Sequence, residues 1–154
     1  MKAVKIRSGE FNNRKKVLTV YYMNGKAIEV HYSQLGIKKN LGAVWVDKET
    51  RGHSLGLRFD DGKEDYMPYD QPLALTKDPE YLLQTHVERL TAVIKATIKE
   101  RRISKRFLAD QLGTSDNQIQ RLLNPTILNK NLEQLYKVAT IIGLEFEWHI
   151  KKAA

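Results

Sequence analysis

Apolar and polar residues alternate through the first half of the chain with the two-residue period of a β-strand. Runs rich in β-branched and aromatic residues predict strands over 17–22, 28–32, 43–47, 54–59 and 64–67. Asn24-Gly25 and Asp61-Gly62 each separate two of these runs and favour hairpins, and Asn24-Gly25 suits a two-residue type I′ turn. The pattern predicts a small, mostly antiparallel β domain over residues 1–69, with a short helical turn or loop within 32–42.

The pattern changes after Pro68. Three prolines fall within PYDQPLALTKDPE, and few strand-forming residues accompany them, so residues 70–78 are interpreted as a Pro-rich linker. Asp78-Pro79-Glu80 then combines a capping acid, a proline at the first helical position and an acid near the positive end of the helix dipole. Leu83, Val87, Leu90, Ile94 and Ile98 follow at spacings of three and four, which predicts a long helix that runs to about Arg102.

Three shorter helices are predicted after the long one. Each begins at a side chain that can cap a helix, buries apolar residues three or four apart, and ends at a glycine or proline signal. The caps are Ser104, Ser115 and Asn131, the stops are Gly113, Asn124-Pro125 and Gly143, and the inward residues are Leu108, Ala109, Leu112, Ile119, Leu122, Leu123, Leu132, Leu135, Ala139 and Ile142. Residues 79–154 are therefore predicted to form a second, helical domain.

The last residues return to strand periodicity. Phe146, Trp148 and Ile150 alternate with charged residues in EFEWHIK, which predicts a C-terminal strand. A strand after a helical domain has unpaired backbone groups, so it either joins the N-terminal sheet or pairs with the same strand of a second chain. We favour the second alternative, a homodimer through Phe146, Trp148 and Ile150. The predicted fold class is α+β.

The amino-acid composition limits the classes of function that the protein can have. The 154 residues contain no cysteine, which excludes disulfides, thiolate metal sites and cysteine nucleophiles. No apolar run approaches the roughly 20 residues that span a bilayer, and the N-terminus has no apolar signal-peptide core. We therefore expect a cytoplasmic protein without a membrane partner. The formal net charge of +8 favours a polyanionic partner.

The segment FLADQLGTSDNQIQRLLNP has the pattern of two short helices joined at one glycine. Ala109 suits a close helix crossing, and Gly113 suits a left-handed turn. With the apolar residues inward, the second helix presents amide and guanidinium side chains that can pair with base edges in the major groove. The expected base or groove contacts are Asn117, Gln118, Gln120, Arg121 and Asn124.

These residues resemble the helix-turn-helix of the phage-repressor-like (XRE/lambda-repressor-like) DNA-binding family. The matching positions are Ser104, Leu108, Ala109, Leu112, Gly113, Ser115, Ile119 and Arg121, and the resemblance covers about residues 80–148. It departs from the family at Lys105, where glutamine is common, and at Asp116, which places a negative charge at the start of the recognition helix. The resemblance implies a sequence-specific regulator of transcription that binds double-stranded DNA, acts as a repressor and requires no cofactor.

Positive charge is concentrated where the long helix meets the first helix of the motif. KATIKERRISKR, residues 95–106, holds six Lys and Arg side chains and one Glu. Such residues beside the DNA backbone give salt-dependent affinity without reading sequence. The expected phosphate contacts are Arg102, Lys105, Arg106, Ser115 and Lys130.

Other functions have weaker support in the sequence. The histidines, at 31, 53, 86 and 149, share no metal-ligand spacing, the acids of 60–65 lack a calcium-loop pattern, and no catalytic motif occurs. We therefore expect neither an enzyme nor a metal site. Three alternatives remain: an antitoxin that binds its toxin through the β domain, a protein-interaction module without specific DNA binding, and an RNA-stacking surface formed by Tyr21, Tyr22, Tyr32 and Trp45.

Overall fold

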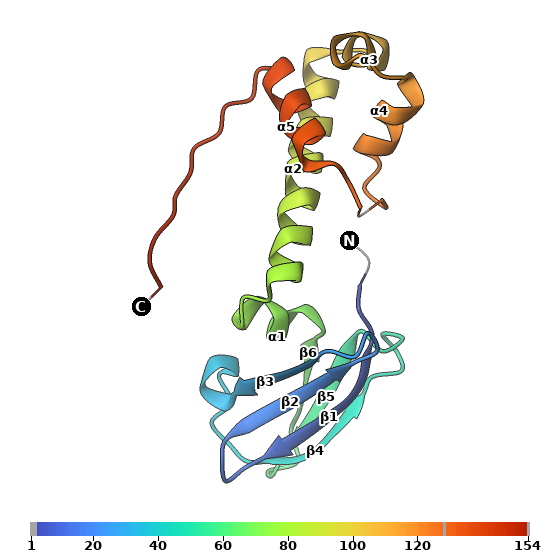
Figure 1. Cartoon of the computed structure of the whole chain (residues 1–154). Coiled ribbons are helices and arrows are strands. Elements are labelled where there is room, and N and C mark those ends of the chain that lie inside the picture. The colour runs from blue at the N-terminus through green and yellow to red at the C-terminus, as the bar shows by residue number, and fades with distance from the viewer. Residues whose placement is uncertain (1–2, 128, 154) are drawn as a thin grey trace. The chain divides into compact units, whose positions relative to one another are not determined.

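The structure, a computed structural model, describes residues 3–127 and 129–153 and has an α+β fold, as predicted. The chain divides into two compact units, one ending at Leu82 and the other beginning at Leu83 (Figure 1). The division lies inside the long helix α2 (Pro79–Arg101). The predicted boundary at residues 69–79 is therefore displaced toward the C-terminus.

The first unit consists of two three-stranded antiparallel sheets. Sheet order is β1-β2-β3 and β4-β5-β6, so every neighbouring pair is joined directly along the chain. The strands are β1 (Ile6–Asn12), β2 (Val17–Tyr22), β3 (Ala27–His31), β4 (Leu41–Val46), β5 (Ser54–Phe59) and β6 (Glu64–Pro68). A 3₁₀ turn, η1 (Tyr32–Leu35), follows β3, within the segment predicted to hold a turn or loop.

Strand β1 is the one strand that we did not predict individually. Arg7, Ser8, Gly9 and Glu10 occupy its centre, so its composition resembles a loop. Pairing with β2 and packing against the second sheet explain why it is extended. A Cβ atom at Gly9 would come within 2.8 Å of Leu55, so glycine permits this close approach of the sheets.

Both predicted hairpins form, but the predicted type I′ turn at Asn24-Gly25 is wrong. Gly25 has φ +90° and Gly62 has φ +85°, whereas Asn24 and Asp61 keep negative φ. In each turn the glycine N–H bonds to the carbonyl three residues earlier, at 3.1 Å for Gly25 and 3.0 Å for Gly62. This geometry is a type I turn followed by a left-handed glycine, which lengthens the loop beyond two residues.

The core of the first unit lies between the two sheets. Buried residues from the facing strands include Leu18, Val20, Tyr22, Leu55 and Leu57. Because β-strand side chains alternate, Thr19 and Tyr21 lie on the opposite face of β2 from this core.

Residues 70–78 are not a linker, contrary to the prediction. They contain helix α1 (Asp70–Leu75), which packs beside β3, and Leu73 is buried in the core of the first unit. Pro72 lies in the first turn of α1, where its missing N–H removes no helical hydrogen bond. Burial of an apolar face explains why this proline-containing segment is helical.

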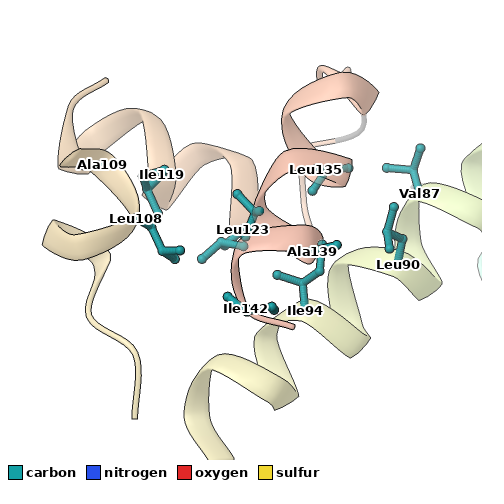
Figure 2. Packing of buried hydrophobic residues seen from close by; sticks show 11 residues of the cluster. Val87, Leu90, Ile94, Leu108, Ala109, Ile119, Leu123, Leu135, Ala139 and Ile142 are labelled. Atoms are coloured by element: carbon teal, nitrogen blue, oxygen red, sulfur yellow. The ribbon is translucent and has the colours of Figure 1, made fainter. Parts of the chain in front are cut away.

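The second unit packs three short helices against the C-terminal part of α2. These are α3 (Lys105–Leu112), α4 (Asp116–Leu123) and α5 (Leu132–Ile141). Their shared core contains Ile94 from α2, Leu108 from α3, Ile119 from α4 and Leu135 from α5, all at most 1% exposed (Figure 2). Leu83, predicted to face inward, is exposed because it lies at the edge of this unit, before the packed part of α2 begins.

The caps predicted for the three short helices form. Ser104 Oγ accepts a hydrogen bond from the Phe107 N–H at 3.0 Å, and Ser115 Oγ accepts one from the Gln118 N–H at 3.2 Å. Asn131 Oδ1 accepts one from the Gln134 N–H at 3.2 Å. Each cap satisfies an N–H that has no partner inside its helix, which explains why the sequence locates these boundaries well.

The C-terminal strand predicted from EFEWHIK does not form. Residues 144–153 run as a single extended segment without ladder hydrogen bonds among the described residues (Figure 1). Aromatic packing holds its start, because the Phe146 ring meets the Tyr136 ring edge to face at 4.8 Å. A strand requires a partner strand for its N–H and C=O groups, and this tail has none within its unit.

Candidate nucleic-acid interface

Helices α3 and α4 pack closely because a small residue, Ala109, lies at their contact and a glycine with left-handed backbone conformation, Gly113, lies between them. Ala109 is 2% exposed, and Leu108 and Ile119 are buried beside it (Figure 2). Gly113 has φ +64°, and the Thr114 N–H bonds to the Ala109 carbonyl at 2.9 Å. This left-handed cap ends α3, and α4 begins three residues later, because glycine adopts this conformation at low cost.

The outer face of α4 is polar. Asn117, Gln118, Gln120 and Arg121 are all exposed, whereas Ile119 and Leu123 face the core. At 3.6 residues per turn, Asn117 and Arg121 lie opposite the core, with Gln118 on one flank and Gln120 on the other. Four of the five predicted base contacts are therefore free to meet a ligand.

Asn124, the fifth predicted base contact, shapes the end of α4. Its Oδ1 accepts hydrogen bonds from the Thr126 N–H at 2.9 Å and from the Thr126 hydroxyl at 2.7 Å. The side chain thereby forms the turn that follows the helix. Only its amide NH₂ group remains for an additional partner.

A cavity of about 470 Å³ lies on the Gln118 flank of α4. Its lining includes Gln118 and Arg121 of α4, Thr114 before that helix, and Asn129 and Lys130 after it. The Lys130 ammonium group donates to Thr91 Oγ1 at 3.1 Å. Burial lowers the pKa of Lys130, and the positive charge of Lys95 lowers it further. Lys130, a predicted phosphate contact, is thus set back toward α2.

The basic residues 95–106 have different roles. The Arg101 guanidinium donates to the carbonyl oxygen of Ile142 at the end of α5. Lys105 and Arg106 begin α3 and are exposed, and Arg106 also forms a 3.5 Å ion pair with Asp110. Arg102 has φ +54°, a left-handed conformation that terminates α2. Of the predicted phosphate contacts, Arg102, Lys105 and Arg106 are exposed at the junction of α2 and α3.

A second cavity, of about 410 Å³, lies on the Gln120 flank of α4. Lys95 and Lys99 of α2, Lys105 of α3 and Gln120 of α4 line it. Lys95 and Lys99 belong to the basic run of residues 95–106 but were not among the individual phosphate contacts that we predicted. Their spacing of four places them on one face of α2, and this spacing is the sequence signal that separates them from the rest of the run.

The structure also bears on the RNA-stacking surface, metal sites and membrane spans considered in the sequence analysis. Tyr22 and Tyr32 are each 1% exposed, so the predicted RNA-stacking surface cannot include them. Within 3–127 and 129–153, no group of three or more His, Asp or Glu side chains is arranged to hold a metal ion. Among the same residues, no helix combines the length and apolar character needed to cross a membrane.

Comparison of the chain with protein-family models, with curated proteins and with solved structures found no match. The assignment of a function therefore depends on the geometry of α4 and its flanks.

Proposed function

We propose that this protein binds double-stranded DNA sequence-specifically and regulates transcription in the cytoplasm, as a repressor that occludes its site. One observation carries the proposal. The outer face of α4 bears amide and guanidinium side chains, and lysines line the cavities on its flanks, one (Lys130) on the Gln118 side and three (Lys95, Lys99 and Lys105) on the Gln120 side. Base edges attract the first kind of side chain and phosphates the second.

In this proposal α4 enters the major groove. Arg121, on the outermost line of the helix, pairs with guanine, and Asn117 and Gln118 pair with adenine. Lys105 and Arg106 at the start of α3 contact one phosphate backbone. These contacts require no cofactor.

We further propose that two copies associate through the C-terminal tail. Phe146, Trp148 and Ile150 are 37%, 65% and 91% exposed, which is unusual for apolar side chains that alternate along an extended segment. Antiparallel pairing of two such tails would satisfy their backbone groups and form a two-fold dimer. A two-fold dimer reads a palindrome whose half-sites lie about 34 Å apart.

Fluorescence anisotropy tests DNA recognition directly. The protein is titrated onto a duplex from its own upstream region and onto a shuffled duplex, across a salt series. We expect binding to the native sequence about a thousandfold tighter and loss of much of this difference in Arg121→Ala. Arg89→Ala is the matched control, because Arg89 is also an exposed arginine but lies on α2, outside both cavities.

Equal binding to both duplexes, or equal loss of specificity in Arg121→Ala and Arg89→Ala, would reject specific recognition by α4. The dimer has a separate test. Light scattering of the full chain and of a variant lacking residues 145–154 should give dimer and monomer masses. An unchanged dimer in the truncated variant would exclude the tail as the seam.

A further inference from the structure

The cavity on the Gln120 flank, which we call the lysine cavity, joins three helices of the second unit. Ile98 of α2 and Leu123 of α4 contribute apolar side chains to its lining, and Gln120 and Asn124 contribute amides. Lys95, Lys99 and Lys105 complete the lining. Its volume of about 410 Å³ is large enough for a small organic ligand.

The lysine cavity carries positive charge without a counter-charge. Lys95 and Lys99 are one helical turn apart on α2, and Lys105 is the first residue of α3, where the helix dipole is positive. No carboxylate lines the cavity in the part of the chain that the structure describes, and none of the three lysines forms an ion pair there.

The charge of Lys95 also acts on Lys130, which lines the other cavity, on the Gln118 flank of α4. After burial, the second cause of its lowered pKa is Lys95. Like charges repel one another, and the lining of the lysine cavity holds Lys95, Lys99 and Lys105 without a carboxylate to offset that repulsion. A bound anion therefore offsets a cost that the empty cavity carries.

We propose that the lysine cavity is a binding site for a phosphoryl group. A phosphoryl group has three peripheral oxygens and about two negative charges, which match three ammonium groups and two amide donors better than a carboxylate does. The group has two sources, a backbone phosphate of bound DNA or a free phosphorylated small molecule. Only the first source rests on the proposed function.

Gln120 and Lys105 link the cavity to DNA recognition. Gln120 belongs both to the exposed face of α4 and to the cavity lining, and Lys105 is both a predicted phosphate contact and a lining residue. A free ligand in the cavity would therefore compete with DNA and act as an inducer. A backbone phosphate in the same place would instead contribute to affinity.

The first experiment is calorimetric titration of the full-length protein with pyrophosphate, against sodium chloride at matched ionic strength. We expect saturable binding of pyrophosphate, weakened about tenfold in Lys99→Gln because one charge-assisted contact is lost. The control Lys152→Gln removes an exposed tail lysine and should bind as the unmodified protein does. Lys99 is exposed, so the variant should retain the native circular dichroism spectrum.

Binding that does not saturate, that chloride reproduces, or that both variants weaken equally would overturn the proposal. None of these outcomes involves DNA, so the phosphoryl site and the proposed DNA binding can fail independently.

A second experiment identifies the source, with the duplex from the upstream region. If a backbone phosphate occupies the cavity, Lys99→Gln lowers the slope of log Kobs against log salt by about 1. If a free molecule is the ligand, that slope is unchanged, and pyrophosphate displaces the duplex from the unmodified protein more readily than from Lys99→Gln. Either result supports a phosphoryl site, whereas an unchanged slope without displacement by pyrophosphate would contradict both sources.

Discussion

Arg101, the last residue of α2, donates a hydrogen bond to the carbonyl oxygen of Ile142 at the end of α5. Its guanidinium also lies over Gly143, where a Cβ atom would collide with Nη1. The negative end of the α5 dipole thereby meets a fixed cation. In a segment rich in positive charge, this arginine stabilises the packing of α2 against α5.

Arg101→Met should therefore lower the free energy of unfolding by about 1–2 kcal/mol, because the α5 carbonyl loses a charged donor. Urea denaturation followed by circular dichroism measures the loss. DNA affinity at low temperature should stay the same, since Arg101 is turned toward α5. A fall in affinity at unchanged stability would show instead that Arg101 contacts the nucleic acid.

Arg102→Gly tests two effects of Arg102 in one variant, the strain of its backbone conformation on stability and the contribution of its charge to DNA binding. The residue has φ +54°, which glycine adopts more readily, so the variant should be about 0.5 kcal/mol more stable. If Arg102 contacts a phosphate, the slope of log Kobs against log salt should also fall by about 1. Lys77→Gly is the matched control, because Lys77 has φ +53° in the first unit. That control should change stability without changing the slope.

Trp45 lies across Gly56, its direct partner on the neighbouring strand. Tyr66, paired with Gly56 on the other side, packs edge to face with the Trp45 indole, with 6.1 Å between the ring centroids. The Arg58 guanidinium lies 5.3 Å from the centre of the Trp45 ring. A side chain at position 56 would occupy the place of the indole. Gly56→Val should therefore destabilise the first unit by about 1–3 kcal/mol.

Fluorescence-monitored denaturation in a Trp148→Phe background reports Trp45 alone. In Gly56→Val, the emission of folded Trp45 should shift to longer wavelength as the ring is displaced into solvent. Urea denaturation followed by circular dichroism, which does not depend on tryptophan, should show the double variant Trp45→Leu/Gly56→Val less destabilised than the sum of the single changes. Strict additivity would contradict the proposed collision between the two side chains.

Asp78 should make stability dependent on acid pH. Burial raises its pKa, but hydrogen bonds from the Lys26 ammonium group at 2.7 Å and from the Tyr81 N–H at 2.9 Å outweigh burial, and the pKa is lowered from 3.8. The folded state therefore binds fewer protons than the unfolded state near this pH. The contribution of Asp78 is present above pH 4 and is lost as pH falls through the folded pKa.

Asp78→Asn tests this pH dependence, because asparagine also caps a helix but does not titrate. Unfolding free energies between pH 2.5 and 6, obtained by urea denaturation, should rise with pH more steeply in the unmodified protein than in Asp78→Asn, within the range of about 2.5–5 set by the carboxyl group. Asp78→Ala should lose about 1 kcal/mol at neutral pH, because the cap is removed. Identical pH profiles for Asp78→Asn and the unmodified protein would exclude the Lys26–Asp78 pair as the cause.

Local sequence determined the helical half of the protein almost completely. Ser104, Ser115 and Asn131 cap helices where predicted, and Gly113 adopts the left-handed conformation predicted for it, because a cap or a left-handed turn depends on only a few neighbouring residues. The outward position of Arg121 also followed from helical periodicity, because the apolar residues around it select the buried face.

Tertiary structure decided what depends on distant partners. Strand β1 and helix α1 form because residues far along the chain cover them, and the tail lacks ladder bonds because no strand lies beside it in its unit. The lysine cavity assembles Lys95, Lys99, Lys105 and Gln120 from three helices, and Arg101 finds its acceptor on a fourth. Sequence periodicity identifies the face on which each side chain lies, but only the packed helices determine which faces meet and which charges lack a partner.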